Sequence, residues 1–228
     1  MELIDQFRPR EWSQVVGQDK ALKTLDLWRK RGGLLGRKVW ISGKSGTGKT
    51  TIARLIAAEV ADPTAIKEVS AKALSVGDIR EEFRKLLFRP LFGAQHGRVL
   101  IINEVHLMRK DVVTEFLTLT EDGPDGCFPQ HAILITTTTA EGALRFEDAP
   151  DCDSAAFLSR FGSKLPLSQT GIADAFAANC ARIARKEDLI ADGMTDEDLL
   201  KRCKRLAQDN RSNHREMLAQ IESGALLA

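Results

Sequence analysis

The segment GKSGTGKT, residues 43–50, is the feature that most constrains how this chain folds and what it binds. It lies between a short apolar run, KVWIS (38–42), and a stretch with helical periodicity from Thr50 to Val60. Glycines at this spacing let successive backbone amides turn towards a phosphate, and the following helix adds its partial positive charge. Lys49 is expected to reach the β and γ oxygens, and Thr50 to hold a magnesium ion. The alternative is a glycine-rich turn that contains Lys-Thr by chance, which the flanking strand and helix disfavour.

Short apolar strands alternate with amphipathic helices over most of the chain. Further strands are expected at about 66–69, 99–102 and 132–136, and a further helix at about 76–87. This alternation predicts an α/β fold with a parallel sheet covered on both faces. From residue 165 onwards the apolar spacing is helical only. We therefore predict a phosphate-binding α/β domain at 1–164 and a small all-α lid of three helices at 165–228.

Composition excludes several classes of protein. With 43% hydrophobic and 29% charged residues, the 228-residue chain has a globular balance. Apolar runs such as Val99 to Ile102 are far shorter than the ~20 residues of a membrane span, and no apolar leader begins the chain. We expect a cytoplasmic protein with no membrane contact. Since the net charge is only +1, any DNA contact would depend on a local basic patch.

The cysteines form no metal or disulfide pattern. Cys127, Cys152, Cys180 and Cys203 are scattered, with no CxxC pair among them. This spacing predicts free thiols, mostly buried, and argues against a zinc site.

The run VLIINEVHLM, residues 99–108, reads as a buried strand that enters a helix. In phosphate-loop enzymes such a strand ends in an acid that holds the metal, and a further acid orients the attacking water. Glu104 fits the second position, whereas Asn103 stands where the first carboxylate is expected. Taken alone, Glu104 could equally be a surface carboxylate at a strand end.

Five stretches carry a resemblance to a known family: FRPREWSQVVGQDKAL (7–22), GKSGTGKT, INEVHLM (102–108), FLSRF (157–161) and SNHREML (212–218). Together they resemble AAA+ ATPases of the replication clamp-loader type, with Holliday-junction branch-migration motors as more distant relatives. In FLSRF, Phe161 replaces the cysteine of the family's Ser-Arg-Cys motif. The resemblance implies a P-loop NTPase core with a helical lid, and ATP and Mg²⁺ as cofactors.

The resemblance also implies residue roles. Thr137, within the run Thr136 to Thr139, corresponds to the first sensor and Arg215 to the second. Catalysis would use Lys49, Glu104, Thr137, Arg160 and Arg215, and the metal would meet Thr50 and Asn103. The implied nucleotide contacts are Val16, Gly17 (both at the adenine), Gly43, Ser45, Gly46, Thr47, Gly48, Lys49, Thr50 and Thr51.

Arg160 corresponds to the family's arginine finger, which enters a neighbouring subunit's site. That role predicts an oligomer with other AAA+ subunits, homomeric or heteromeric, as a pentamer, a hexamer or a filament. The alternative is a structural ion pair at the domain boundary. The chain stops after the lid, without the family's helical collar or zinc module, so we expect assembly through AAA+ contacts or through other chains.

Arg80 and Arg84 lie four residues apart on a stretch that resembles the channel-facing helix of clamp loaders. One helix face carrying both would suit the phosphates of DNA. A solvated face beside Glu81 and Glu82 is the alternative of equal weight.

Asn103 is nearly isosteric with aspartate but neutral, so we expect ATP binding to persist while turnover falls. A natural nucleotide-holding subunit and an engineered trap of the ATP state both fit this residue.

The sequence therefore predicts an ATPase similar to a clamp-loader subunit, which assembles on DNA or on a client protein such as a sliding clamp. The alternative is an ATP-dependent DNA-coating regulator of the transposition type, which forms filaments. A protein-remodelling motor ranks last, because the chain has no tyrosine to supply an aromatic pore loop.

Overall fold

A five-stranded parallel sheet forms the centre of the chain in the computed structural model, which describes residues 2–91, 93, 95–121, 128–139 and 154–227. Its strands are β1 (Arg37–Ser42), β2 (Ile66–Ser70), β3 (Arg98–Asn103), β4 (Ala132–Thr138) and β5 (Ser163–Pro166). They lie in the order β2-β3-β4-β1-β5, and each neighbouring pair is parallel. The predicted α/β fold with a parallel sheet is confirmed.

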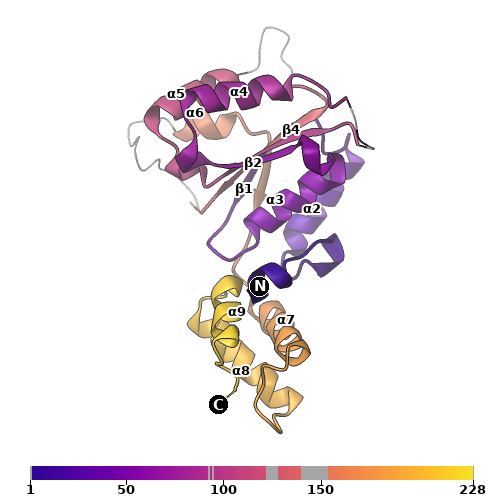
Figure 1. Cartoon of the computed structure of the whole chain (residues 1–228), viewed down its shortest axis with the longest axis vertical. Helices are drawn as coiled ribbons and strands as arrows, with labels where there is room; N and C mark the ends of the chain where they lie inside the picture. Colours follow the sequence, from indigo (N-terminus) through magenta and orange to yellow (C-terminus); the bar gives the residue numbers. More distant parts are fainter. Residues whose placement is uncertain (1, 92, 94, 122–127, 140–153, 228) are drawn as a thin grey trace.

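Helices cover both faces of the sheet (Figure 1). One face packs against α2 (Asp19–Lys30) and α3 (Lys49–Val60). The other packs against α4 (Val76–Leu86), α5 (Lys110–Leu119) and α6 (Ser154–Ser159). Short 3₁₀ turns connect the elements at Trp12–Gln14, Pro63–Ala65, Ala71–Ala73 and Val105–Leu107.

Side chains of β3 alternate between the two layers of the core. Val99 and Ile101 face α2 and α3, whereas Leu100 and Ile102 face α4 and α5, and all four are at most 1% exposed. Burial on both faces explains why this strand reads as a continuous apolar run rather than as alternating polar and apolar residues. At its end, position 103 falls on the α3 face, towards the phosphate loop.

The carboxyl-terminal helices form a separate small layer at one end of the molecule (Figure 1). They are α7 (Ala173–Lys186), α8 (Asp196–Asp209) and α9 (His214–Glu222), and they share one apolar cluster. The amino-terminal helix α1 (Leu3–Gln6) joins this cluster through the buried side chain of Leu3. A segment from the amino-terminal end of the chain thus completes the apolar core of the lid.

Strand β5 runs across the domain boundary that the sequence predicts after residue 164. It pairs with β1 from Ser163 to Pro166, so the sheet extends to residue 166. The division at 164 stays a prediction, and β5 itself had no clear signal in the sequence.

Within the described ranges, no helix is long and apolar enough to cross a membrane. Cys180 and Cys203 are free and buried, and burial raises the pKa of both thiols, that of Cys203 to about 11. Cys127 and Cys152 lie outside the described residues.

Candidate nucleotide-binding site

The phosphate loop connects β1 to α3 through glycines in conformations that other residues rarely adopt. Gly46 has φ +77° and Gly48, which precedes the first turn of α3, has φ +93°. Only glycine reaches this region without a steric penalty from Cβ. Inside the loop, the Thr47 hydroxyl donates to the Lys44 carbonyl at 2.8 Å. The Lys49 ammonium donates to the same carbonyl at 3.0 Å.

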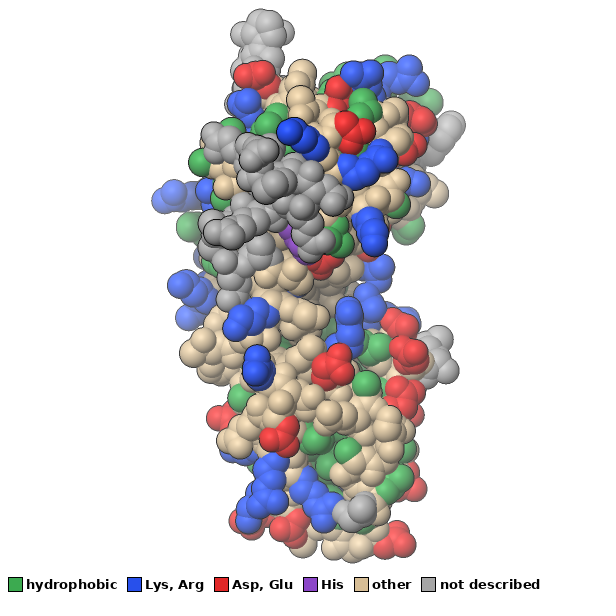
Figure 2. Space-filling model, turned by 90° about the vertical axis from the view of Figure 1, so that its left-hand side faces the viewer, with side chains coloured by type: hydrophobic (Ala, Val, Ile, Leu, Met, Phe, Trp, Pro, Cys, Tyr) green, Lys and Arg blue, Asp and Glu red, His purple; other side chains and the backbone are tan. Residues whose placement is uncertain are grey.

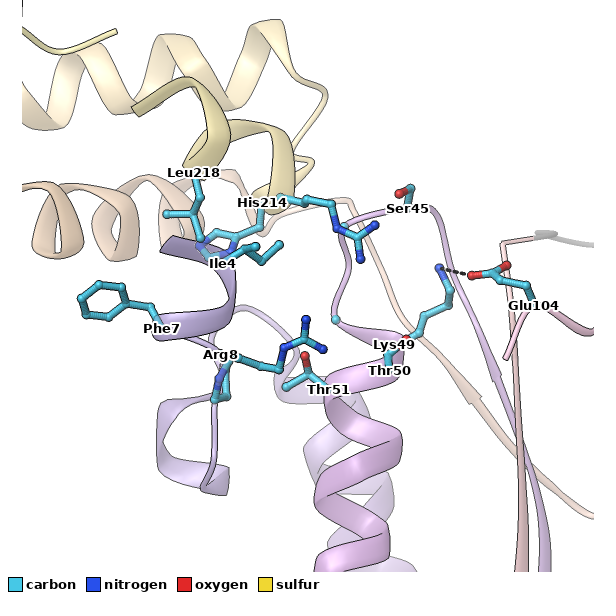
Figure 3. Close-up of a pocket in the computed structure, with 14 residues that line it drawn as sticks. Ile4, Phe7, Arg8, Ser45, Lys49, Thr50, Thr51, Glu104, His214 and Leu218 are labelled. Carbon is cyan, nitrogen blue, oxygen red and sulfur yellow. Dashed lines mark ion pairs between the residues drawn. The ribbon is translucent and has the colours of Figure 1, made fainter. Parts of the chain in front are cut away.

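A cleft opens in front of this loop, between the sheet domain and the lid (Figure 3). Four parts of the chain line it: the amino-terminal segment, the phosphate loop with the start of α3, the end of β3, and α9. The lining residues are Ile4, Phe7, Arg8, Pro9, Ser45, Gly46, Gly48, Lys49, Thr50, Thr51, Glu104, His214, Arg215 and Leu218. Lys49, Arg8 and Arg215 outnumber Glu104, so the charge suits an anionic ligand.

Other residues predicted to contact nucleotide lie behind the loop or beside the cleft. Thr47 is 2% exposed, and a Cβ on Gly43 would meet the Leu167 carbonyl at 2.8 Å. These two residues shape the loop from behind. Val16 lines an adjoining pocket that shares Phe7 and Arg8 with the cleft.

Gly17 and Gln18 connect the amino-terminal segment to the lid and to the loop. Gly17 has φ +75°, and a Cβ there would lie 3.0 Å from the Ile172 side chain. Gln18, which is 4% exposed, donates to the carbonyls of Thr47 and Ser168 at 3.3 and 3.0 Å. The position of Gln18 directly after Gly17 is the one signal in the sequence that could have predicted this role.

Glu104 is held at the end of β3 in a left-handed conformation, with φ +55°. Such a φ is uncommon outside glycine and concentrates at functional sites. Its Oε1 lies 4.0 Å from the Lys49 ammonium and its Oε2 lies 3.4 Å from Nδ1 of His106. The carboxylate therefore sits at the edge of the cleft beside the lysine of the loop.

Thr137 on β4 contacts both residues at the end of β3. Its hydroxyl donates to Oδ1 of Asn103 at 3.0 Å and accepts from the Glu104 amide at 3.3 Å. Thr136 instead donates to the Val39 carbonyl at 3.3 Å. Thr137 is thus hydrogen-bonded to both Asn103 and Glu104.

The other end of the Asn103 amide meets an acid on the neighbouring strand. Nδ2 of Asn103 donates to Oε1 of Glu68, on β2, at 2.6 Å. Glu68 also accepts from Arg54 of α3, through Nε at 2.7 Å and Nη2 at 3.2 Å. This role of Glu68 was not predicted, because in the sequence Glu68 is an ordinary polar residue of a short strand.

The donor set at the loop suits Mg²⁺ only in part. Mg²⁺ is held in nucleotide sites by few protein ligands, with waters and phosphate oxygens completing the shell. The Thr50 hydroxyl, on the first turn of α3, fits that pattern. Asn103 does not offer a charge, and the described residues contain no cluster of three His, Cys, Asp or Glu that could form a metal cage by itself.

The lid closes over the phosphate loop through the start of α9. A Cβ on Gly46 would overlap the side chain of Asn213, so the lid touches the loop there. His214 accepts from Nδ2 of Asn179 at 3.1 Å, and its ring lies 4.8 Å from that of Phe176. Burial lowers the pKa of His214 to about 4, so it is neutral near pH 7. Arg215, next along the helix, lines the cleft, and its role as the second sensor stays a prediction.

Arg160 is positioned by two phenylalanines that enter the core on either side of it. The ring of Phe161 lies 5.3 Å from that of Trp40 and 5.6 Å from that of Phe157. Arg160 itself is 29% exposed and pairs with Glu121 at 3.4 Å. It is not among the described residues that line the cleft of its own chain.

Arg80 and Arg84 lie on the exposed side of α4. Arg80 makes a two-pronged ion pair with Glu115 of α5, with both N–O distances 2.7 Å. Arg84 is exposed. On the face shown in Figure 2, basic and acidic side chains alternate over both domains. Arg80 thus has a structural partner, and a role of either residue in DNA binding stays a prediction.

The RuvB subunit of the Holliday junction branch migration complex from Streptomyces griseus is 33% identical over 120 residues, 51% of this chain and 30% of that protein. DNA polymerase III subunit tau from Bacillus subtilis is 31% identical over 160 residues, 58% of this chain and 26% of that protein. The chain therefore spans less than a third of the length of either relative.

Solved structures share the fold. The Thermotoga maritima RuvB branch migration motor has a TM-score of 0.59 at 22% identity, over 95% of this chain and 72% of that one. A mutant of the same motor has a TM-score of 0.66 at 22% identity, over 95% of this chain and 65% of that one.

Residues 39–167 match the family described as "ATPase family associated with various cellular activities (AAA)". That span includes most of β1, the phosphate loop, Glu104 and Arg160. This chain belongs to the AAA family of ATPases.

Proposed function

We propose that this chain binds ATP with Mg²⁺ at the interface between AAA+ subunits and uses the nucleotide to assemble on DNA or on a protein partner, as a clamp-loader subunit does. One observation carries the proposal. Side chains of the phosphate loop, the end of β3, the amino-terminal segment and the lid converge on a single positively charged cleft. A ligand that touches all four would couple its own chemistry to the position of the lid.

The cleft offers a group for each part of a triphosphate. Loop amides and the start of α3 would face the phosphates, and Lys49 would contact the phosphate oxygens. Bound Mg²⁺ would neutralise charge on the phosphate oxygens, with Thr50 as its protein ligand. Arg215 from α9 and Arg8 from the amino-terminal segment add charge on the lid side. Glu104 is the base that would orient water.

Hydrolysis is attenuated in this proposal, because Asn103 brings no charge to the metal side of the cleft. The geometry supports that reading. Both ends of the Asn103 amide are already engaged, one by Glu68 and the other by Thr137. Nucleotide binding relies on the loop and lid and does not require a charge at this position.

The position of Arg160 supports assembly. Arg160 directly follows α6 and is not among the described residues that line the cleft of its own chain. To act on a phosphate it would have to enter the cleft of a neighbouring subunit, where such a residue stabilises charge on the transferring phosphoryl group. The ion pair with Glu121 is partly exposed, which makes it weak enough to exchange for a phosphate.

DNA is the partner that the named relatives favour. RuvB is a subunit of a Holliday junction branch migration complex and tau is a subunit of DNA polymerase III. A branch-migration motor is therefore a second candidate function, favoured by the match to RuvB. A DNA-coating filament of the transposition-regulator type is the other alternative. A role on DNA also fits the cytoplasmic location that the sequence predicts.

ATP binding and hydrolysis measured with no DNA, with a primed duplex and with a four-way junction test these functions, alongside light scattering and negative-stain imaging. Stimulation by the primed duplex and a small closed assembly would support the clamp-loader proposal. Selective stimulation by the junction would replace it with the branch-migration function, and long helical filaments on DNA would replace it with the coating function. No binding of ATP under any condition would overturn all three.

A further inference from the structure

A line of hydrogen bonds crosses the sheet edge behind the cleft and includes an acid outside the expected motif. Arg54 donates twice to Glu68, at 2.7 and 3.2 Å. Asn103 donates to Glu68 at 2.6 Å and accepts from Thr137 at 3.0 Å. Thr137 in turn accepts from the Glu104 amide at 3.3 Å. The line connects the helix of the phosphate loop to the base at the end of β3.

The amide of Asn103 matches this line where a carboxylate would not. Its nitrogen faces the Glu68 carboxylate and its oxygen faces the Thr137 hydroxyl. With aspartate in the same place, two carboxylate oxygens would meet at the present 2.6 Å separation, and like charges at that distance repel strongly. Asn103 is therefore part of a built arrangement with Glu68, and not an isolated loss of charge.

Glu68 is close to where the missing charge is needed. Its strand lies next to β3, with Ser70 of β2 opposite Asn103. Its partner Arg54 is four residues after Thr50 on α3, and side chains at that spacing share one helix face. Glu68 thus lies on the same side of the sheet as the phosphate loop, one strand out from the usual position.

We propose that Glu68 is the acid that serves the metal ion in this site, with Asn103 as the amide that holds it in place. The inference rests on the proposed ATP–Mg²⁺ binding. It assigns to Glu68 the role of the acid that Asn103 replaces in this chain. The carboxylate that serves the metal ion would then come from Glu68 of β2 rather than from position 103 of β3.

The chemistry of Mg²⁺ accommodates such a move. Mg²⁺ keeps several of its waters when bound to protein, so an acid can act on it through a water. A carboxylate has about four lone-pair sites, and Glu68 uses three for Arg54 and Asn103. One site is left to accept from a metal-bound water. Because Arg54 offsets part of the charge of Glu68, the metal is held less strongly than by an unpaired acid, consistent with attenuated turnover.

A charge-relocation experiment tests this assignment by nucleotide affinity rather than by turnover. The affinity for a fluorescent ATP analogue is measured in excess EDTA and then over a Mg²⁺ titration, for the unchanged chain, Glu68→Gln and the double variant Glu68→Gln/Asn103→Asp. We expect Glu68→Gln to keep its affinity in EDTA and to lose about tenfold or more of the gain from Mg²⁺, as outer-shell partners of metals typically do. The double variant returns the acid to β3 beside a donating amide, and should regain the Mg²⁺ effect.

Arg54→Gln is the matched control, since it breaks the same ion pair but keeps the acid. It should retain the Mg²⁺ gain, with the thermal midpoint of each variant recorded to detect unfolding. A full Mg²⁺ gain in Glu68→Gln would overturn the inference. An equal loss in Glu68→Gln and Arg54→Gln would also overturn it, because the ion pair would then be only structural. Failure of the unchanged chain to bind the analogue at any Mg²⁺ concentration would instead overturn the proposed function.

Discussion

The ammonium nitrogen of Lys49 lies 4.0 Å from Oε1 of Glu104, so the cation of the phosphate loop and the carboxylate at the end of β3 face each other at the cleft (Figure 3). Lys49 is only 6% exposed, whereas Glu104 is 33% exposed. A bound triphosphate would compete with Glu104 for the lysine. Nucleotide binding would then leave the carboxylate free to act on water. Lys49 would thus serve binding, and Glu104 would serve hydrolysis.

Glu104→Gln should keep nucleotide affinity and lose turnover. Glutamine preserves the size of the side chain but cannot accept a proton, and general-base catalysis typically contributes about 10² to 10⁴ in rate. We expect ATP hydrolysis to fall by at least about 10²-fold, with affinity for a fluorescent ATP analogue within about threefold of the unchanged chain. Hydrolysis at an unchanged rate would remove Glu104 from the mechanism.

Lys49→Ala should weaken nucleotide binding itself. Hydrogen bonds to charged groups contribute about 1.5–3 kcal/mol, which corresponds to roughly 10- to 100-fold in affinity. The upward shift of the melting temperature by ATP should disappear in the same variant. Lys67→Ala, on the exposed side of β2, is the control for loss of one lysine charge and should bind normally. Equal affinity in both variants would contradict the role of Lys49.

Arg160→Ala should still bind nucleotide and assemble. If the residue acts as an arginine finger, the rate of ATP hydrolysis should fall by a factor of about 10³ or more. Because the finger would come from a neighbouring subunit, mixing Arg160→Ala with Lys49→Ala should restore part of the activity. Each mixed interface can then combine one intact loop with one intact arginine. Activity of the mixture no greater than the sum of the separate variants would argue for action within one chain.

Glu121→Ala separates this role from the ion pair of Arg160. It removes the 3.4 Å partner but leaves the arginine, so it should hydrolyse ATP at least as fast as the unchanged chain. An exposed pair of this kind contributes about 0–1 kcal/mol to stability. Loss of activity in Glu121→Ala equal to that in Arg160→Ala would favour the structural interpretation that the sequence left open.

The sheet and its phosphate loop could be predicted because their signals are local. Four strands and the helix at 50–60 fall within two residues of their predicted bounds, since burial on both faces makes the strands continuously apolar. Strand β5 could not be found this way. It has four residues, alternates in burial and ends in proline, so its pairing with β1 is decided by tertiary contact.

The candidate site likewise contains residues that the sequence could predict and residues that it could not. Motif positions such as Lys49, Glu104 and Arg215 reach the cleft because their spacing from a loop or helix start determines where they lie. Glu68 and Gln18 were missed, since their roles depend on which strand or segment lies beside them. Asn103 was identified as unusual, but its fit to Glu68 required the register between β2 and β3.

Phe161→Ala should destabilise the sheet domain by about 3–5 kcal/mol, the usual cost of truncating a buried phenylalanine. The ring is 2% exposed and packs on Trp40 and Phe157, so its removal leaves a cavity beneath Arg160. At about 2–4 °C per kcal/mol for a chain of this size, the melting temperature should fall by roughly 10 °C. Ser159→Ala, on the exposed side of the same segment, is the control and should melt close to the unchanged chain. Equal melting of both variants would show that Phe161 is not a core residue.

His214 should make the stability of the nucleotide-free chain depend on pH. Burial lowers its folded pKa to about 4, below the 6.5 of the unfolded chain, so the unfolded state takes up the proton first. Stability is therefore complete above pH 6.5 and declines as the pH falls towards 4, by up to roughly 3 kcal/mol from this residue. Protonation would also convert Nε2 of His214 from an acceptor into a donor, so that it could no longer accept from the Asn179 amide. Urea unfolding at several pH values, compared between the unchanged chain and His214→Gln, isolates the effect, because glutamine can accept from Asn179 without titrating. The difference between the two proteins should change steadily between pH 6.5 and 4; parallel curves over that range would show that His214 is not held neutral by the lid.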